Sequence, residues 1–174
     1  MRANARSKPA NDAAHPLATP TDLSSKQAAA VATALNGLLA DVFVLQMKTR
    51  NFHWHVSGPD FRDIHEALDE QIGQLGAAID PLAERVRKIG GMTLRSMKET
   101  LKTARIVENE DDFVAPRDML LELMEDNKAM AKALRAAHGV CDDHHDVASA
   151  SLIELWIDET EKRIWFLFEM TREA

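Results

Sequence analysis

Apolar residues recur every three or four positions over four long stretches of the 174-residue chain. This spacing places them on one face of a helix, so the pattern predicts four long α-helices. We expect the first helix to begin between Leu23 and Lys26, with Ser24 or Ser25 as its N-cap, and to end near Asn51. Its apolar stripe consists of Val31, Leu35, Leu38, Leu39, Val42, Leu45 and Met47.

The same pattern predicts the bounds of the other three long helices. The second is expected over about 60–89, closed by a Gly-Gly pair and kinked at Pro81, whose ring removes one backbone hydrogen bond. The third is expected from Pro116 through 139, and the fourth over about 146–172. An acidic, histidine-rich loop is expected between these two.

The connection between the second and third helices is long, running from 92 to 115. Within it Ser96 and Glu99 match a capping box, which predicts a short helix there. The chain shows no convincing strand pattern. Four long helices with one long connection predict an all-α, four-helix bundle with a crossover.

The N-terminal residues 1–22 carry no helical stripe, so we expect a flexible tail there and the bundle domain over 23–174. The tail is mildly basic, because Arg2, Arg6 and Lys8 outnumber Asp12.

Composition narrows the class of protein. The formal net charge of −7 argues against adhesion of the whole body to nucleic acid and suits a protein that gathers cations. The single cysteine, Cys141, excludes an intrachain disulfide. We expect a soluble, cytoplasmic protein without a membrane partner, because no apolar run approaches the roughly 20 residues of a span and no secretory signal is evident.

The second helix carries four side chains that are able to bind a metal ion: His65, Asp69, Asp80 and Glu84. Both pairs are four residues apart, and the step of 11 residues between the pairs returns to nearly the same face at about 100° per residue. At about 1.5 Å per residue, however, that step separates the pairs by roughly 16 Å. One straight helix therefore cannot close both pairs around one ion, whereas an antiparallel copy of the helix across a two-fold axis can.

The ligand types suit iron, since carboxylates and imidazole bind Fe(II) and no thiolate is present to favour zinc. The Glu-x-x-His motif of the usual ferritin centre is absent from the sequence. His65 begins a partial match to the zinc-protease motif His-Glu-x-x-His, but Asp69 replaces its second histidine and disfavours that interpretation. Either pair taken alone is more typical of a surface hydrogen bond than of a metal site.

Three segments together resemble the Dps family of mini-ferritins. They are KTRNFHWHVSGPDF over 48–61, HEALDE over 65–70 and DPLAERVRKIGG over 80–91. The ferroxidase spacing of that family is matched by His53, His65, Asp69, Asp80 and Glu84.

The resemblance implies a hollow dodecamer of ferritin-like bundles with di-iron-type ferroxidase sites at two-fold interfaces. His53 and His65 of one chain would face Asp80 and Glu84 of a neighbour, with Asp69 beside them. Fe(II) would be oxidised by hydrogen peroxide, the preferred oxidant, or by oxygen, and Fe(III) mineral would collect inside.

The resemblance leaves the roles of several residues open. Trp54, next to a ligand, is expected either to absorb an oxidising equivalent or simply to pack, and His55 either to act as an accessory ligand or to face solvent or backbone. The loop over 142–146 would border an acidic three-fold pore. Ser151 stands where the family often has a second acid of an Asp-x-x-Thr-x-Asp pattern, which leaves the pore ligands open.

DNA binding is the second activity that the resemblance implies, through the basic residues of the tail. Twelve tails on one particle would act together, while the acidic body opposes their approach. Two alternatives to iron oxidation therefore remain: a nucleoid protein that protects DNA by coating it, with iron oxidation secondary, and a plain helical scaffold with coincidental ligands.

Overall fold

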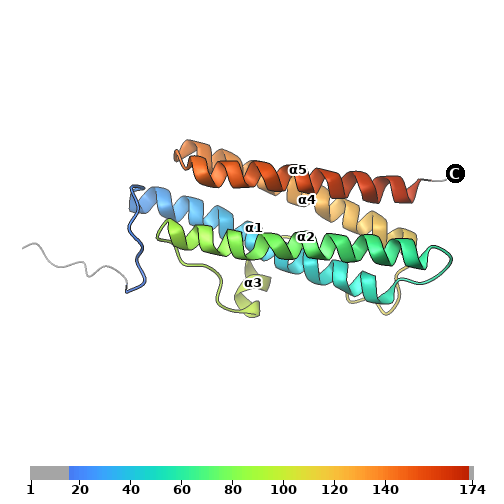
Figure 1. The fold of residues 1–174 in the computed structure, drawn as a ribbon. Coiled ribbons are helices and arrows are strands. Elements are labelled where there is room, and N and C mark those ends of the chain that lie inside the picture. The colour runs from blue at the N-terminus through green and yellow to red at the C-terminus, as the bar shows by residue number, and fades with distance from the viewer. Residues whose placement is uncertain (1–15, 173–174) are drawn as a thin grey trace, which may run out of the picture.

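The computed structural model describes residues 16–172, which form five α-helices and no strand. These are α1 (Ser25–His55), α2 (Phe61–Lys88), α3 (Met97–Thr103), α4 (Pro116–Asp143) and α5 (Val147–Thr171). The long helices pack as two pairs, α1 with α2 and α4 with α5, and α3 lies against α1 (Figure 1). The predicted bundle and its short extra helix are confirmed.

Each pair of long helices is an antiparallel hairpin (Figure 1). The turn between α1 and α2 lies at one end of the bundle, and the turn between α4 and α5 lies at the opposite end. The connection that carries α3 returns the chain along the bundle, so that α2 and α4 run in the same direction. This is the crossover topology expected of a bundle with one long connection.

The core is a single apolar cluster to which the four long helices contribute. The Ser24 side chain accepts a hydrogen bond from the backbone N–H of Gln27, and the Gln27 side chain accepts one from the backbone N–H of Ser24, which forms the capping box of α1. On α2 the buried stripe includes Ile64, Leu68, Leu75, Leu82 and Val86. The helix continues through Pro81 without ending.

Two helices run further than the sequence pattern predicts. The first reaches His55 rather than Asn51, because Phe52 is buried in the core and its carbonyl accepts the capping N–H of Val56. The third reaches Asp143 rather than 139, because the fully buried Cys141 continues its apolar face. The predicted end of the third helix at 139 is therefore wrong.

The predicted tail lies largely outside the described residues, which begin at residue 16. The part that is described rests against the C-terminal end of α2. There Arg87 donates a hydrogen bond to the carbonyl of Leu17, and the Thr19 carbonyl lies 3.1 Å from the position that a Cβ would take at Gly90. Gly90 also has φ +84°, a backbone conformation that favours glycine.

Buried ion pairs tie the hairpins together. The Lys48 ammonium of α1 lies 2.8 Å from Glu122 and 2.7 Å from Asp126, both on α4. The guanidinium of Arg85 on α2 lies 2.5 Å from the carboxylate of Asp146, which caps the N-terminus of α5. These contacts fix the register of the two hairpins along the bundle axis.

Of the described helices, only α1 is long and apolar enough to span a membrane, with a mean hydropathy of 1.8 in its most apolar window. In the bundle, 61% of that window is buried. The helix is the central core element of the fold, and its hydropathy follows from that position.

Candidate metal centre

Two predicted ligands meet where α1 ends and α2 begins. The imidazole rings of His53 and His65 stack with their centroids 3.7 Å apart. Nδ1 of His53 lies 2.9 Å from the carbonyl oxygen of His65, and Nδ1 of His65 lies 2.9 Å from the carbonyl oxygen of His53. Each histidine is therefore held in place by the backbone of the other.

This reciprocal contact decides which ring nitrogen carries the proton. A carbonyl oxygen only accepts hydrogen bonds, so Nδ1 of His53 and Nδ1 of His65 must be the donors. In a neutral ring the Nε2 lone pair is then free for a metal ion, and neither Nε2 has a hydrogen-bond partner among residues 16–172. Donation of the other ring N–H to a carbonyl is the usual arrangement around metal-binding histidines.

The three predicted carboxylate ligands lie along α2 on a face separate from its core stripe. Asp69, Asp80 and Glu84 are all exposed. The Glu84 carboxylate lies 3.2 Å from the Lys88 ammonium, a surface pair that contributes little to stability. These side chains are thus accessible to a partner molecule or to an ion.

Within residues 16–172 the structure gathers no group of three or more potential metal ligands. It brings His53 and His65 together but leaves Asp80 and Glu84 further along α2. The helical rise puts Asp80 roughly 16 Å beyond Asp69, as the sequence predicts. One chain therefore presents the predicted ligands as separate groups, with His53 beside His65 at one place and Asp80 with Glu84 further along α2.

Trp54 and His55, which follow His53 at the end of α1, both lie at the surface. Trp54 is 56% exposed, so it does not pack into the core of the described chain, and the Arg50 guanidinium lies 6.0 Å from its ring centroid. His55 is exposed and lies 2.8 Å, through Nδ1, from the carbonyl of Asn51 in its own helix. This geometry agrees with the expectation that His55 faces solvent and backbone.

The acidic segment between the third and fourth long helices is shorter than predicted. Asp142 and Asp143 belong to α4, and only His144 and His145 form the turn before the α5 cap. Asp146 is buried, and its carboxylate oxygens already accept hydrogen bonds from Arg85 and from the backbone and side chain of Ser149. In this chain Asp146 is a helix cap and not a free acid.

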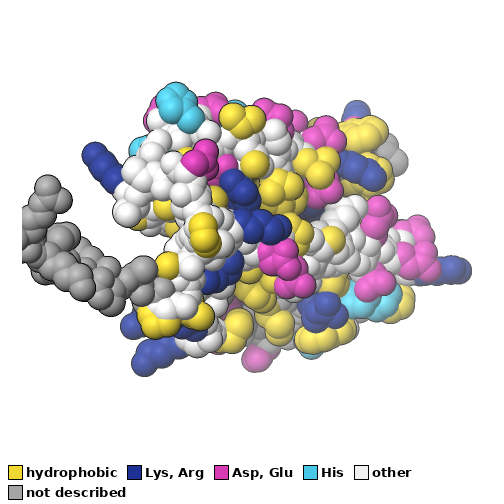
Figure 2. Space-filling view, turned by 60° about the vertical axis from the view of Figure 1, so that its left-hand side comes forward, with side chains coloured by type: hydrophobic (Ala, Val, Ile, Leu, Met, Phe, Trp, Pro, Cys, Tyr) yellow, Lys and Arg dark blue, Asp and Glu magenta, His cyan; other side chains and the backbone are white. Residues whose placement is uncertain are grey.

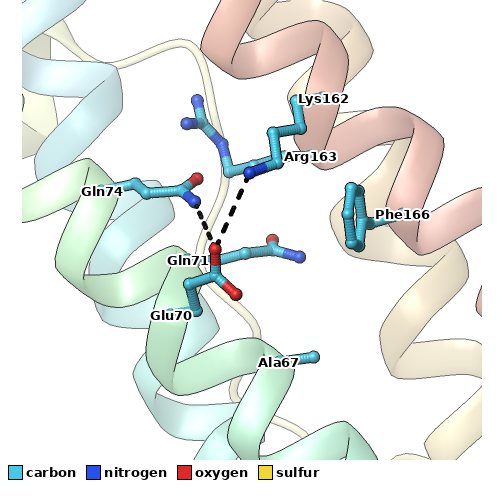
Figure 3. Close-up of a pocket in the computed structure, with 7 residues that line it drawn as sticks. All are labelled: Ala67, Glu70, Gln71, Gln74, Lys162, Arg163 and Phe166. Atoms are coloured by element: carbon cyan, nitrogen blue, oxygen red, sulfur yellow. Dashed lines mark hydrogen bonds and ion pairs between the residues drawn. The ribbon is translucent and has the colours of Figure 1, made fainter.

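A small pocket lies between α2 and α5, lined by Glu70, Gln74, Lys162 and Phe166 among others (Figure 3). The Glu70 carboxylate accepts a hydrogen bond from Gln74 at 3.2 Å and lies 3.9 Å from the Lys162 ammonium. The cavity volume is about 20 Å³. That is enough for a water molecule and too little for a larger ligand.

Comparison with known proteins places the chain in a family. Residues 32–173 match the model of the ferritin-like domain. The DNA protection during starvation protein of Brevibacillus brevis is 34% identical over 79% of this chain and 91% of its own length. The protein of the same name from Helicobacter pylori is 31% identical over 76% of this chain and 92% of its own length.

Solved structures give the same result. The Dps protein from Bacillus brevis superposes with a TM-score of 0.82 at 31% identity, covering 86% of this chain and 100% of that one. The Dps protein from Vibrio cholerae, described as a member of a broad superfamily of ferritin-like diiron-carboxylate proteins, superposes with a TM-score of 0.83 at 29% identity, covering 89% and 98%. The chain therefore belongs to the DNA protection during starvation (Dps) family of ferritin-like proteins.

Proposed function

We propose that the protein oxidises Fe(II) at sites shared between two chains and stores the Fe(III) product. The observation that carries the proposal is the reciprocal contact of His53 and His65, which holds both rings with Nε2 free for a metal ion. Membership in a ferritin-like family supports iron as that metal.

The missing ligands would come from a second copy of the chain. In an antiparallel pair of α2 helices, the partner's Asp80 and the partner's Glu84 lie opposite His65 and Asp69, because the two ligand pairs share one stripe. The arrangement is self-complementary, so one pair of chains forms two equivalent sites. Exposure of Asp69, Asp80 and Glu84 in the single chain agrees with this role.

The chemistry follows from the donors. Imidazole nitrogen and carboxylate oxygen both bind Fe(II), and the negative carboxylates favour the more highly charged Fe(III) product. Two Fe(II) ions each lose one electron to hydrogen peroxide, whose O–O bond breaks, and two protons complete two water molecules. The reaction consumes both of the reagents that generate hydroxyl radicals.

Membership in the Dps family also supports a proposal about assembly and about the role of the assembled protein. We propose that twelve chains form a hollow cytoplasmic shell that collects the Fe(III) mineral and thereby protects DNA from oxidative damage. With a net charge of −7 per chain, such a shell would attract iron cations.

The test is oxidation of Fe(II) by hydrogen peroxide, followed through Fe(III) absorbance. We expect His53→Ala and Asp80→Ala each to slow the protein-dependent initial rate at least tenfold, since each removes a ligand. Glu161→Gln is the control. It alters a surface pair with Arg135 within the α4–α5 hairpin, away from the candidate ligands, and should keep the wild-type rate. Equal rates in the wild type and both site variants would refute the proposal.

DNA coating is a second candidate, motivated by the name of the relatives, DNA protection during starvation. The segment that binds DNA would be the basic tail, because Arg2, Arg6 and Lys8 outnumber Asp12 there and would contact phosphates. Gel retardation of the full chain and of a chain lacking residues 1–15 tests this. Tail binding predicts retardation that truncation abolishes and that weakens steeply with salt, whereas unchanged retardation would exclude the tail.

A further inference from the structure

One short stretch of the chain concentrates positive charge on an otherwise acidic protein. Residues 85–105 contain seven lysines and arginines and a single carboxylate, Glu99, whereas the whole chain has a formal net charge of −7. The stretch comprises the last turn of α2, the connection that follows it, and α3. Acidic residues return only at Glu108. The charge of the molecule is therefore segregated along the chain and not evenly mixed.

Four of these seven cations are already engaged within the described residues. Two hold buried carboxylates, one forms a surface pair and one donates to backbone carbonyls: Arg85 with Asp146, Arg105 with Asp41, Lys88 with Glu84, and Arg87 with Leu17 and Gly91. The other three, Arg95, Lys98 and Lys102, are exposed. Within residues 16–172 their side chains form no ion pair and no hydrogen bond. We call these three residues the α3 patch.

The packing of α3 directs the two lysines away from the body. Thr100 is buried on the side of α3 that faces α1. Lys98 and Lys102 are each two residues from Thr100, which is about 200° around the helix, so they lie on the opposite face. The Arg105 backbone N–H donates to the carboxylate of Asp41 at 2.6 Å and fixes the segment directly after α3. The patch is therefore held on a fixed part of the surface.

The one carboxylate in the stretch does not pair with the patch side chains. Glu99 accepts a hydrogen bond from the backbone N–H of Arg95 at 2.9 Å, while its own backbone N–H donates to the Ser96 side chain. It thus serves the capping box of α3. Lys98 and Lys102 lie one helical turn apart, and like charges at that spacing repel and destabilise a helix. A partner with dense negative charge would remove this repulsion.

The α3 patch lies in the same half of the bundle as the first described residues (Figure 1). There the Leu17 carbonyl accepts a hydrogen bond from Arg87, so the N-terminal segment joins the body beside the basic stretch. Lys and Arg side chains gather at the lower left of Figure 2, whereas Asp and Glu side chains are more frequent along its top and right. A polyanion that approaches this side therefore meets cations on an acidic molecule.

We propose that Arg95, Lys98 and Lys102 bind the phosphate backbone of double-stranded DNA. Lysine and arginine contacts to phosphates supply affinity without reading the base sequence. The proposal rests on DNA coating as a function of the protein, and it adds a fixed contact surface on the body to the basic tail. The net charge of −7 opposes adhesion of the whole body but not of a local patch that lies apart from most of the acids.

Binding of the assembled, full-length protein to a short fluorescent DNA duplex, measured by anisotropy between about 50 and 200 mM salt, tests the patch. The patch variant combines Arg95→Gln, Lys98→Gln and Lys102→Gln. We expect its Kd to rise about tenfold or more at the lower salt concentration. The slope of log affinity against log salt should become shallower by about 2–3, because each lost phosphate contact removes about 0.9.

The control removes the same amount of charge elsewhere, so it separates a local contact from the effect of net charge. It replaces three exposed cations of α2 and α4: Arg62→Gln, Arg117→Gln and Lys128→Gln. We expect the control to keep a Kd and a salt slope close to those of the wild type.

Equal Kd and equal salt slope in the patch and control variants would overturn the proposal and leave DNA coating through the tail intact. Failure of the wild type to bind the duplex would overturn both. Loss of the assembled state in the patch variant alone, seen by size-exclusion chromatography, would assign the patch to a contact between chains and overturn the proposal as well.

Discussion

The claim that each oxidation site is divided between two chains can be tested by complementation. One variant chain lacks the histidines, His53→Ala with His65→Ala, and keeps the carboxylates. A second chain lacks the carboxylates, Asp80→Ala with Glu84→Ala, and keeps the histidines. Neither variant alone contains a complete site, whereas a mixed pair contains one complete site and one that lacks all four ligands.

The magnitude follows from the geometry of α2. The rise of roughly 16 Å between Asp69 and Asp80 prevents a chain from completing its own site, so activity must come from mixed pairs. With random pairing of equal amounts, about half of the pairs are mixed, and each carries one intact site of two. The mixture should therefore regain about one quarter of the wild-type rate.

The assay is peroxide-driven oxidation of Fe(II), measured through Fe(III) absorbance after the two variants are unfolded and refolded together. Variants refolded separately and then combined are the control, because their pairs remain unmixed. A co-refolded sample no faster than this control, with the assembly intact, would refute the shared site. Full wild-type activity of either variant alone would refute it as well.

Two further predictions concern stability. Arg85→Ala leaves the buried Asp146 carboxylate without its cation and should lower the free energy of unfolding by about 3–5 kcal/mol, measured in urea. Burial raises the pKa of Cys141 to about 11 from its usual 9.0, so the folded chain keeps the thiol protonated when the unfolded chain ionises. The resulting stabilisation is complete below pH 9, is lost as the pH rises to 11, and amounts to about 2–3 kcal/mol. Between pH 9 and 11 the free energy of unfolding in urea should fall less in Cys141→Ala than in the wild type, by that same amount. An equal fall in both proteins would contradict the assignment.

The sequence predicted the helices well where apolar periodicity was uninterrupted and less well at their ends. The sequence predicts that the first helix ends near Asn51, because turn-forming residues follow soon after. In the structure Phe52 still packs in the core, and the helix continues to His55. The sequence predicts that the third helix ends at Gly139, because an acidic segment follows soon after. Cys141 nevertheless continues the buried face, so packing extends the helix beyond the polarity signal.

The separation of the candidate ligands into two groups along α2 was predictable, because it depends only on residue spacing and helical rise, and the proposed division of the site between two chains rests on it. The tautomer of His53 and His65 was not predictable from the sequence. It depends on two carbonyl contacts across the turn between α1 and α2, and no local pattern encodes these.

The mutual contact of His53 and His65 has a thermodynamic consequence for iron affinity. Both rings lose their rotational freedom when the chain folds, so this half of the proposed site need not lose it again on binding. Fixing an exposed side chain on binding costs about 0.5–1.5 kcal/mol, and Asp80 and Glu84 still face that cost. The entropy of ordering would therefore fall on the carboxylate half, and a substitution that restrains those side chains should tighten iron binding more than any further restraint of the histidines.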